Sequence, residues 1–182
     1  MRTERLKVRY LPALLGLLLL AGCGGSEARP ARDSLPSYLA EVEPIRLGVN
    51  HLLDGADPIL DAYREHRTAA AAAWRRMNGL EERFAAYAVR IADVRHVPPP
   101  LRSAQRRYAH TFVFEDAYLS SLAAAIPDRE FDDLPDTQDR QRRAIIAWRI
   151  AVESLAAREG TTLPADLRAA GRGEIAPSPE GS

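Results

Sequence analysis

Residues 42–94, with the sequence VEPIRLGVNHLLDGADPILDAYREHRTAAAAAWRRMNGLEERFAAYAVRIADV, decide the fold of this chain. Alternating steps of three and four residues reach apolar or tyrosine side chains at every stop except His66, and charged residues lie between the stops. This average spacing of 3.5 residues is typical of helices that pack side by side. The pattern therefore predicts long helices with a continuous apolar stripe. We call its members the seam: Val42, Ile45, Val49, Leu52, Ala56, Ile59, Tyr63, His66, Ala70, Ala73, Met77, Leu80, Phe84, Tyr87, Ile91 and Val94.

The sequence leaves two interpretations open for the first connection. Gly55-Ala56-Asp57-Pro58 offers a helix stop, an N-cap aspartate and a proline at the first helical position. These signals predict a hairpin between a helix at 37–54 and a helix at 58–95. Because the seam continues unbroken through this stretch, the alternative is one long helix with a kink at Pro58.

The rest of the chain is also helical in pattern, and no strand-like alternation of any length is present. Pro98-Pro99-Pro100 ends the preceding helix, and Gly160 follows the last apolar repeat. Further helices are expected at 100–126, 137–159 and 163–170. The sequence thus predicts an all-α, up-down bundle over residues 37–170, with four main helices and a short C-terminal helix.

The N-terminus has the pattern of an export signal. Four basic residues and one acid lie within residues 1–10, and residues 11–21 are almost wholly apolar but too short to span a bilayer stably. Leu20-Ala21-Gly22-Cys23 closes this segment and resembles the lipobox of bacterial lipoproteins. The composition of the rest resembles, more loosely, the uncharacterised Ala/Arg-rich helical lipoproteins of high-GC actinobacteria.

The lipobox resemblance implies that residues 1–22 are a lipoprotein signal peptide and that Cys23 carries the lipid. Residues 23–36 are then expected to be a flexible, lipid-anchored tether, and the Gly- and Pro-rich residues 171–182 a disordered tail. The implied location is the extracytoplasmic face of the cell membrane, or the outer membrane if the host has one.

Charge argues against nucleic acid as a partner. Residues 1–22 contain four of the 25 basic residues and one of the 25 acidic residues, so residues 23–182 carry a net charge of −3. A mildly acidic domain is a poor binder of nucleic acid. The exposed basic groups Arg102, Arg106 and Arg107, and Arg140, Arg142 and Arg143, are expected at opposite ends of two antiparallel helices.

The acidic stretch 128–139 resembles an EF-hand calcium loop in its spacing, with Asp133 where that loop requires glycine. A metal site there would use Asp128, Glu130, Asp132, Asp136 and Asp139. The alternative is that these acids end one helix and cap the next.

A second candidate site lies on the seam. If the bundle binds a small ligand or ion, we expect His66, Tyr63, His110 and Phe112 to contribute. The alternative is that His66 is a hydrogen-bonded core residue. No nucleophile elbow, phosphate-binding glycine loop or His-Glu-x-x-His motif is present, so we expect neither catalysis nor a cofactor. The sequence favours an interaction or scaffolding module that binds another envelope protein or a second copy of itself.

Overall fold

The computed structural model describes residues 33–168 and 175–176. Its elements are α1 (Leu35–Leu53), α2 (Ala56–Arg64), α3 (Ala70–Ala92), the 3-10 turn η1 (Pro99–Leu101), α4 (Arg102–Ala125), α5 (Gln138–Glu159) and α6 (Ala165–Arg168). The described ranges contain helices and no strand, so the predicted all-α bundle is confirmed. Cys23, the signal segment 1–22 and most of the expected tether lie outside these ranges.

The first helix begins two residues earlier than the sequence pattern predicts. The Ser34 hydroxyl oxygen accepts a hydrogen bond from the Ser37 main-chain N–H at 3.3 Å, which is the contact of an N-cap residue. Pro36 lies in the first turn, where its missing N–H costs no helical hydrogen bond. The ordered bundle therefore starts at Leu35.

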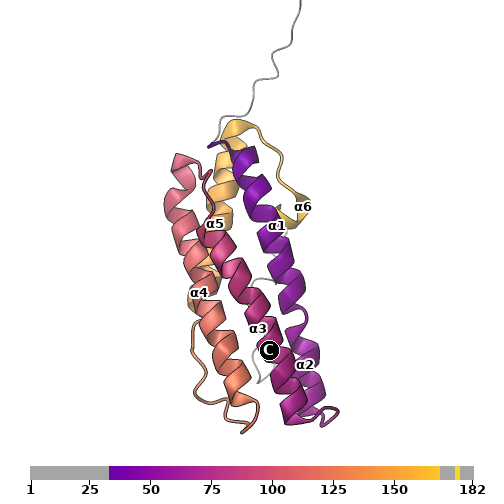
Figure 1. Ribbon diagram of the computed structural model, residues 1–182. Helices are drawn as coiled ribbons and strands as arrows, with labels where there is room; N and C mark the ends of the chain where they lie inside the picture. The colour runs from indigo at the N-terminus through magenta and orange to yellow at the C-terminus, as the bar shows by residue number, and fades with distance from the viewer. Residues whose placement is uncertain (1–32, 169–174, 177–182) are drawn as a thin grey trace, which may run out of the picture.

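The chain reverses direction after Arg64 and not at Gly55–Pro58. Helices α1 and α2 follow one another in the same direction, and α3 returns antiparallel along both of them (Figure 1). The kinked-helix alternative is therefore correct for the Gly55–Pro58 connection, and the hairpin placed there is wrong. A single helix over 58–95 is also wrong, because residues 65–69 form the turn.

The turn after α2 uses His66 in a backbone conformation that usually requires glycine. His66 has φ 57°, its N–H donates to Tyr63 C=O at 3.1 Å, and Arg67 N–H donates to Ala62 C=O at 2.8 Å. These two bonds form a Schellman motif, which ends a helix at a left-handed residue. His66 is thus an exposed turn residue, and its interpretation as a buried core histidine is wrong.

Apart from His66, the seam forms the core as predicted. Its side chains are buried or partly buried along the interface of α1 and α2 with α3. On the other side of α3, α4 packs against it and α5 packs against α4. The Tyr108 and Trp148 rings stack there with centroids 4.3 Å apart, and both side chains are fully buried.

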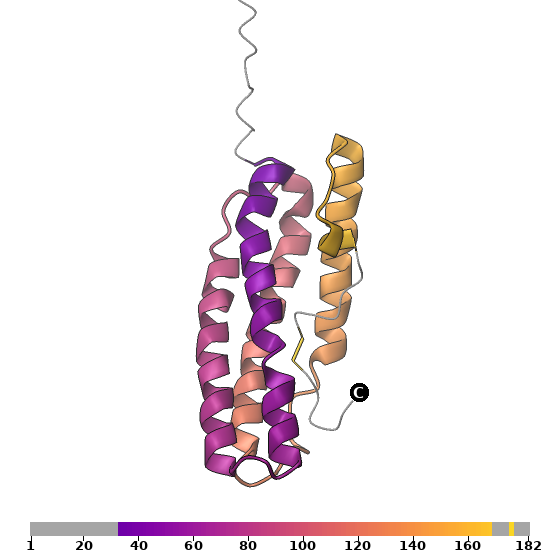
Figure 2. The ribbon, with the colours of Figure 1, turned by 90° about the vertical axis from the view of Figure 1, so that its right-hand side faces the viewer.

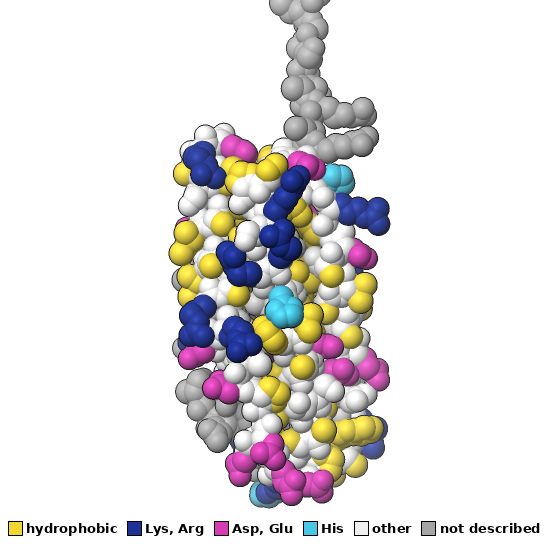
Figure 3. Space-filling view, turned by 90° about the vertical axis from the view of Figure 1, so that its left-hand side faces the viewer, with side chains coloured by type: hydrophobic (Ala, Val, Ile, Leu, Met, Phe, Trp, Pro, Cys, Tyr) yellow, Lys and Arg dark blue, Asp and Glu magenta, His cyan; other side chains and the backbone are white. Residues whose placement is uncertain are grey.

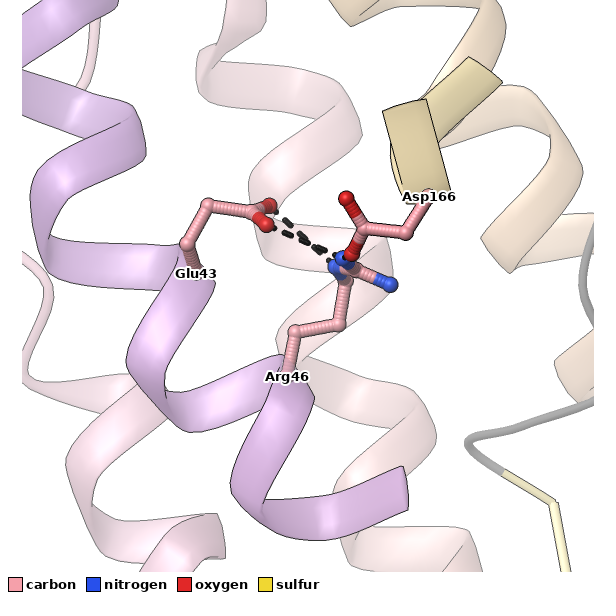
Figure 4. A network of polar contacts seen from close by, with 3 residues as sticks. All are labelled: Glu43, Arg46 and Asp166. Carbon is pink, nitrogen blue, oxygen red and sulfur yellow. Dashed lines mark hydrogen bonds and ion pairs between the residues drawn. The ribbon is translucent and has the colours of Figure 1, made fainter. Parts of the chain in front are cut away.

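The contact between α1 and α5 is sparse, and α6 and residues 175–176 lie on this side of the bundle (Figure 2). Helix α6 is attached to α1 through Arg46, which is 1 % exposed. The Arg46 guanidinium donates to Glu43 Oε2 at 2.9 Å and pairs with Asp166 of α6 (Figure 4). Ala176, inside the tail expected to be disordered, is also buried. No helix within the described ranges is long and apolar enough to cross a membrane.

Candidate functional site

The four residues proposed as ligand-binding from the sequence do not lie together. Tyr63 and His66 border a shallow hollow at the α2–α3 turn, which Arg129 also lines. Phe112 is 2 % exposed in the core, where its ring stacks on Phe84. His110 is exposed beside the edge of the Phe114 ring. The described residues therefore do not form the predicted shared site.

Tyr63 and His66 instead take part in a joint between two loops. Tyr63 donates its hydroxyl hydrogen to Ile126 C=O at 2.6 Å and accepts from Arg129 Nε at 3.1 Å. The Arg129 guanidinium also lies over the Tyr63 ring and 3.1 Å from His66 Nδ1. These contacts link the α2–α3 turn to the α4–α5 loop, and they give Tyr63 and His66 structural partners.

The acidic loop gains no support as a metal site. Asp128, Glu130, Asp132, Asp136 and Asp139 are exposed. Among the residues that the structure describes, no three His, Cys, Asp or Glu side chains gather closely enough to hold a metal ion.

The two arginine clusters of α4 and α5 lie closer together than predicted. Trp148 of α5 stacks on Tyr108, and Arg140 lies over the Phe114 ring with 5.3 Å to its centroid. The start of α5 is therefore level with the middle of α4, because the loop 126–137 runs back along the lower half of α4 (Figure 1). Figure 3 shows the result: basic side chains gather in the upper half of this face, and acidic ones at its lower end.

A different region combines positive charge with a concave shape. A groove of about 610 Å³ runs between α3 on one side and α1 and α2 on the other. Its apolar floor includes Leu52, Ile59 and Leu80. We call it the arginine groove after its cationic rim of Arg75, Arg76 and Arg83, beside which His51 also lines the hollow.

Glycines on both walls shape this groove in two different ways. A Cβ atom on Gly79 of α3 would meet no atom closer than Arg83 Nη1 at 4.0 Å, so the groove is open there. A Cβ atom on Gly48 of α1 would lie 2.4 Å from the Tyr87 hydroxyl oxygen, so only glycine allows this tyrosine to lie against α1. Tyr87 thereby closes one end of the lining.

The arginines of the arginine groove form no ion pair with any residue that the structure describes. No Asp or Glu lines it, and within the described part of the chain no carboxylate forms an ion pair with Arg75, Arg76 or Arg83. Guanidinium groups bind carboxylates and phosphates through two parallel hydrogen bonds. Three of them around one hollow can bind an anionic group while its apolar part contacts the floor.

The sequence contained part of the signal for this groove. Arg75, Arg76 and Arg83 fall between the seam positions, and Arg76 and Arg83 are seven residues apart on one helix face. The concavity was not predictable in the same way, since its lining combines Gly48 and Gly55 on one side with Gly79 of α3 on the other.

Comparisons with protein-family models, with curated proteins and with solved structures found no match to this chain.

Proposed function

We propose that this protein is a lipid-anchored module on the extracytoplasmic face of the cell membrane and that it works by binding rather than by catalysis. Its partner is an acidic segment of another envelope protein, which lies in the arginine groove. The observation that carries this proposal is the arrangement of Arg75, Arg76 and Arg83 around an apolar hollow without any carboxylate in its lining. The lipobox-like Leu20-Ala21-Gly22-Cys23 supports the location.

The anchor has a direct test. Replacing Cys23 with serine removes the atom that would carry the lipid, because a hydroxyl oxygen does not form the thioether. We expect the variant to leave the membrane fraction, whereas the wild-type chain stays with it. Equal distribution of the two proteins would contradict the anchor and leave the groove untouched.

The groove is tested with a fluorescent hexa-aspartate peptide as the acidic probe. The double variant Arg76→Glu, Arg83→Glu should bind it at least about tenfold more weakly, because two bidentate contacts become repulsive. The matched control, Arg142→Glu with Arg158→Glu, makes the same change of net charge at exposed positions of α5. We expect this control to retain affinity. An equal loss in both variants would show that net charge, and not the groove, attracts the probe.

The same proteins also test whether the chain associates with itself. Sedimentation of the wild-type chain and of the groove variant distinguishes a second copy from a foreign partner. A dimer that the two groove substitutions dissociate would identify an acidic surface of a second copy as the occupant and overturn the assignment to another envelope protein.

A further inference from the structure

The interface between α4 and α5 contains a group of buried polar residues within an otherwise apolar core. Glu115 of α4 is 2 % exposed and Gln141 of α5 is 1 % exposed. Glu115 lies at an inward position of its helix, between the core residues Phe112 and Leu119. A buried carboxyl group is costly unless it has hydrogen-bond partners, so its partners indicate what this part of the interface holds.

One of those partners is the main chain of Ala176, which lies 61 residues later in the sequence. Ala176 N–H donates to Glu115 Oε1 at 2.7 Å, and Gln138 Nε2 donates to Ala176 C=O at 3.1 Å. Side chains of two helices thus bind both main-chain polar groups of one residue. We call this arrangement of Glu115 and Gln138 around Ala176 the main-chain crevice.

The docked residue Ala176 is part of the buried core, yet it lies outside every helix. Ala176 is 2 % exposed, contributes one methyl group and belongs to no helix. Pro177 follows it and favours an extended backbone at Ala176, which leaves both main-chain groups free to pair with the crevice. Both hydrogen bonds of Ala176 therefore involve its main chain and not its side chain.

We propose that the main-chain crevice is a binding site for an extended peptide. Its resident ligand is the chain's own Ile175-Ala176, and a free peptide that contains this sequence binds there once these two residues are undocked. This site is separate from the arginine groove, whose residues lie on α1, α2 and α3.

The polar atoms around the carboxyl group agree with such a site. Burial raises the pKa of Glu115 to about 7, and hydrogen bonds from the Ala176 main chain and the Gln141 side chain partly oppose that increase. Tyr118, which is hydrogen bonded to Gln138, also interacts electrostatically with Glu115. A carboxyl group that is partly neutral at physiological pH can bind a main-chain N–H without a buried counter-ion.

The first test measures docking in the full mature chain through hydrogen exchange of the Ala176 amide. We expect strong protection in the wild type and in Glu115→Gln, which keeps the acceptor oxygen. Protection should fall at least tenfold in Glu115→Leu and in Gln138→Leu, which remove the acceptor and the donor.

Thermal melting of the same variants separates docking from general unfolding. Glu115→Leu removes a buried acid, so its midpoint should not decrease although Ala176 loses protection. Exchange of Ala176 at the unprotected rate in the wild type would overturn the proposal. Unchanged protection in both leucine variants would overturn it as well.

The second test asks whether the site accepts a free peptide. Ala176→Pro removes the N–H that Glu115 binds and undocks the segment, whereas the control Ala176→Gly keeps both main-chain groups. A labelled synthetic peptide of residues 171–182 should bind the Ala176→Pro chain at least tenfold more tightly than the Ala176→Gly chain, where the resident segment competes. The double variant Ala176→Pro, Glu115→Leu should lose this binding. A folded Ala176→Pro chain that binds no peptide, or binds it equally well without Glu115, would contradict the proposal.

Discussion

The arginine groove and the main-chain crevice both present charged or polar groups without an opposite charge, and they differ in how those groups are satisfied. Arg75, Arg76 and Arg83 lie at the surface, where water solvates them and the groove can stay open at little cost. Glu115 is buried, so it requires a partner from the protein, and the chain's own Ala176 supplies it. An exposed site can therefore stay open at little cost, whereas a buried site loses hydrogen bonds when its ligand leaves.

This difference separates stability from binding in a way that substitutions can test. Substitutions of Arg46 and Glu115, which bind α6 and Ala176, should alter the free energy of unfolding. Changes on the cationic rim of the arginine groove should alter affinity and leave stability nearly unchanged.

The largest effect is expected at Arg46, which attaches α6 to α1. Arg46→Ala leaves Glu43 and Asp166 without their shared cation and opens a cavity beneath α6. We expect a loss of about 3 kcal/mol, at the low end for a buried pair because Asp166 is half exposed. Urea denaturation measures this loss, and Arg46→Met, which refills the cavity, should recover part of it. If Arg46→Ala unfolds at the wild-type urea midpoint, the contact of α6 with α1 contributes nothing to stability.

The next effect is a pH dependence caused by Glu115. Its pKa in the folded protein is raised from 4.5 to about 7, so the folded state holds a proton that the unfolded state has released. Stability is then full below about pH 4.5, falls as the pH rises to about 7, and is constant above. Glu115→Gln removes this loss and should be more stable than the wild type by up to about 3 kcal/mol at pH 8, with little difference at pH 4.5.

Urea denaturation at the two pH values checks this prediction. The control Glu153→Gln changes an exposed acid on α5 and should follow the wild type at both. A stability gap between Glu115→Gln and the wild type that does not depend on pH would contradict the shifted titration of Glu115.

A smaller effect is expected where the arginine groove depends on close packing. In Gly48→Ala the new Cβ atom would lie 2.4 Å from the Tyr87 hydroxyl oxygen, so the ring must move out of the lining. We expect a net loss of about 1–2 kcal/mol, since overpacking outweighs the gain in helix propensity. The double variant Gly48→Ala, Tyr87→Ala removes the clash, and an equal loss there would indicate that Tyr87 is not the cause.

The sequence predicts the buried helix faces correctly, but it does not predict every turn between the helices. The seam identifies most of the α1–α2–α3 core because burial requires apolar side chains at the helical spacing, whatever the direction of the chain. The reversal at His66 was missed because a left-handed helix end is normally marked by glycine, and here a histidine adopts φ 57°. Gly160, which does mark such an end at φ 65°, was identified correctly.

The two candidate sites were predictable only in part. Glu115 and Gln141 fall on inward positions of amphipathic helices, and a polar residue at such a position indicates a buried partner. That partner, Ala176, lies in a segment whose composition favours disorder, and no local pattern indicates a main-chain contact with a distant helix. Side-chain type and spacing therefore locate the helix faces, whereas the contents of the crevice depend on tertiary packing.

The smallest expected effect distinguishes open space from packed space within the arginine groove itself. Gly79→Ala adds a methyl group that meets no atom closer than 4.0 Å, so it should stabilise α3 by about 0.5–1 kcal/mol through helix propensity alone. The same methyl group enters the groove between its apolar floor and Arg83, so affinity for the acidic probe should decrease about threefold, or about 0.6 kcal/mol. Thermal melting and peptide titration of one variant therefore move in opposite directions. If affinity stays at the wild-type value while stability rises, the bound segment lies above the floor and is held by the arginine rim alone.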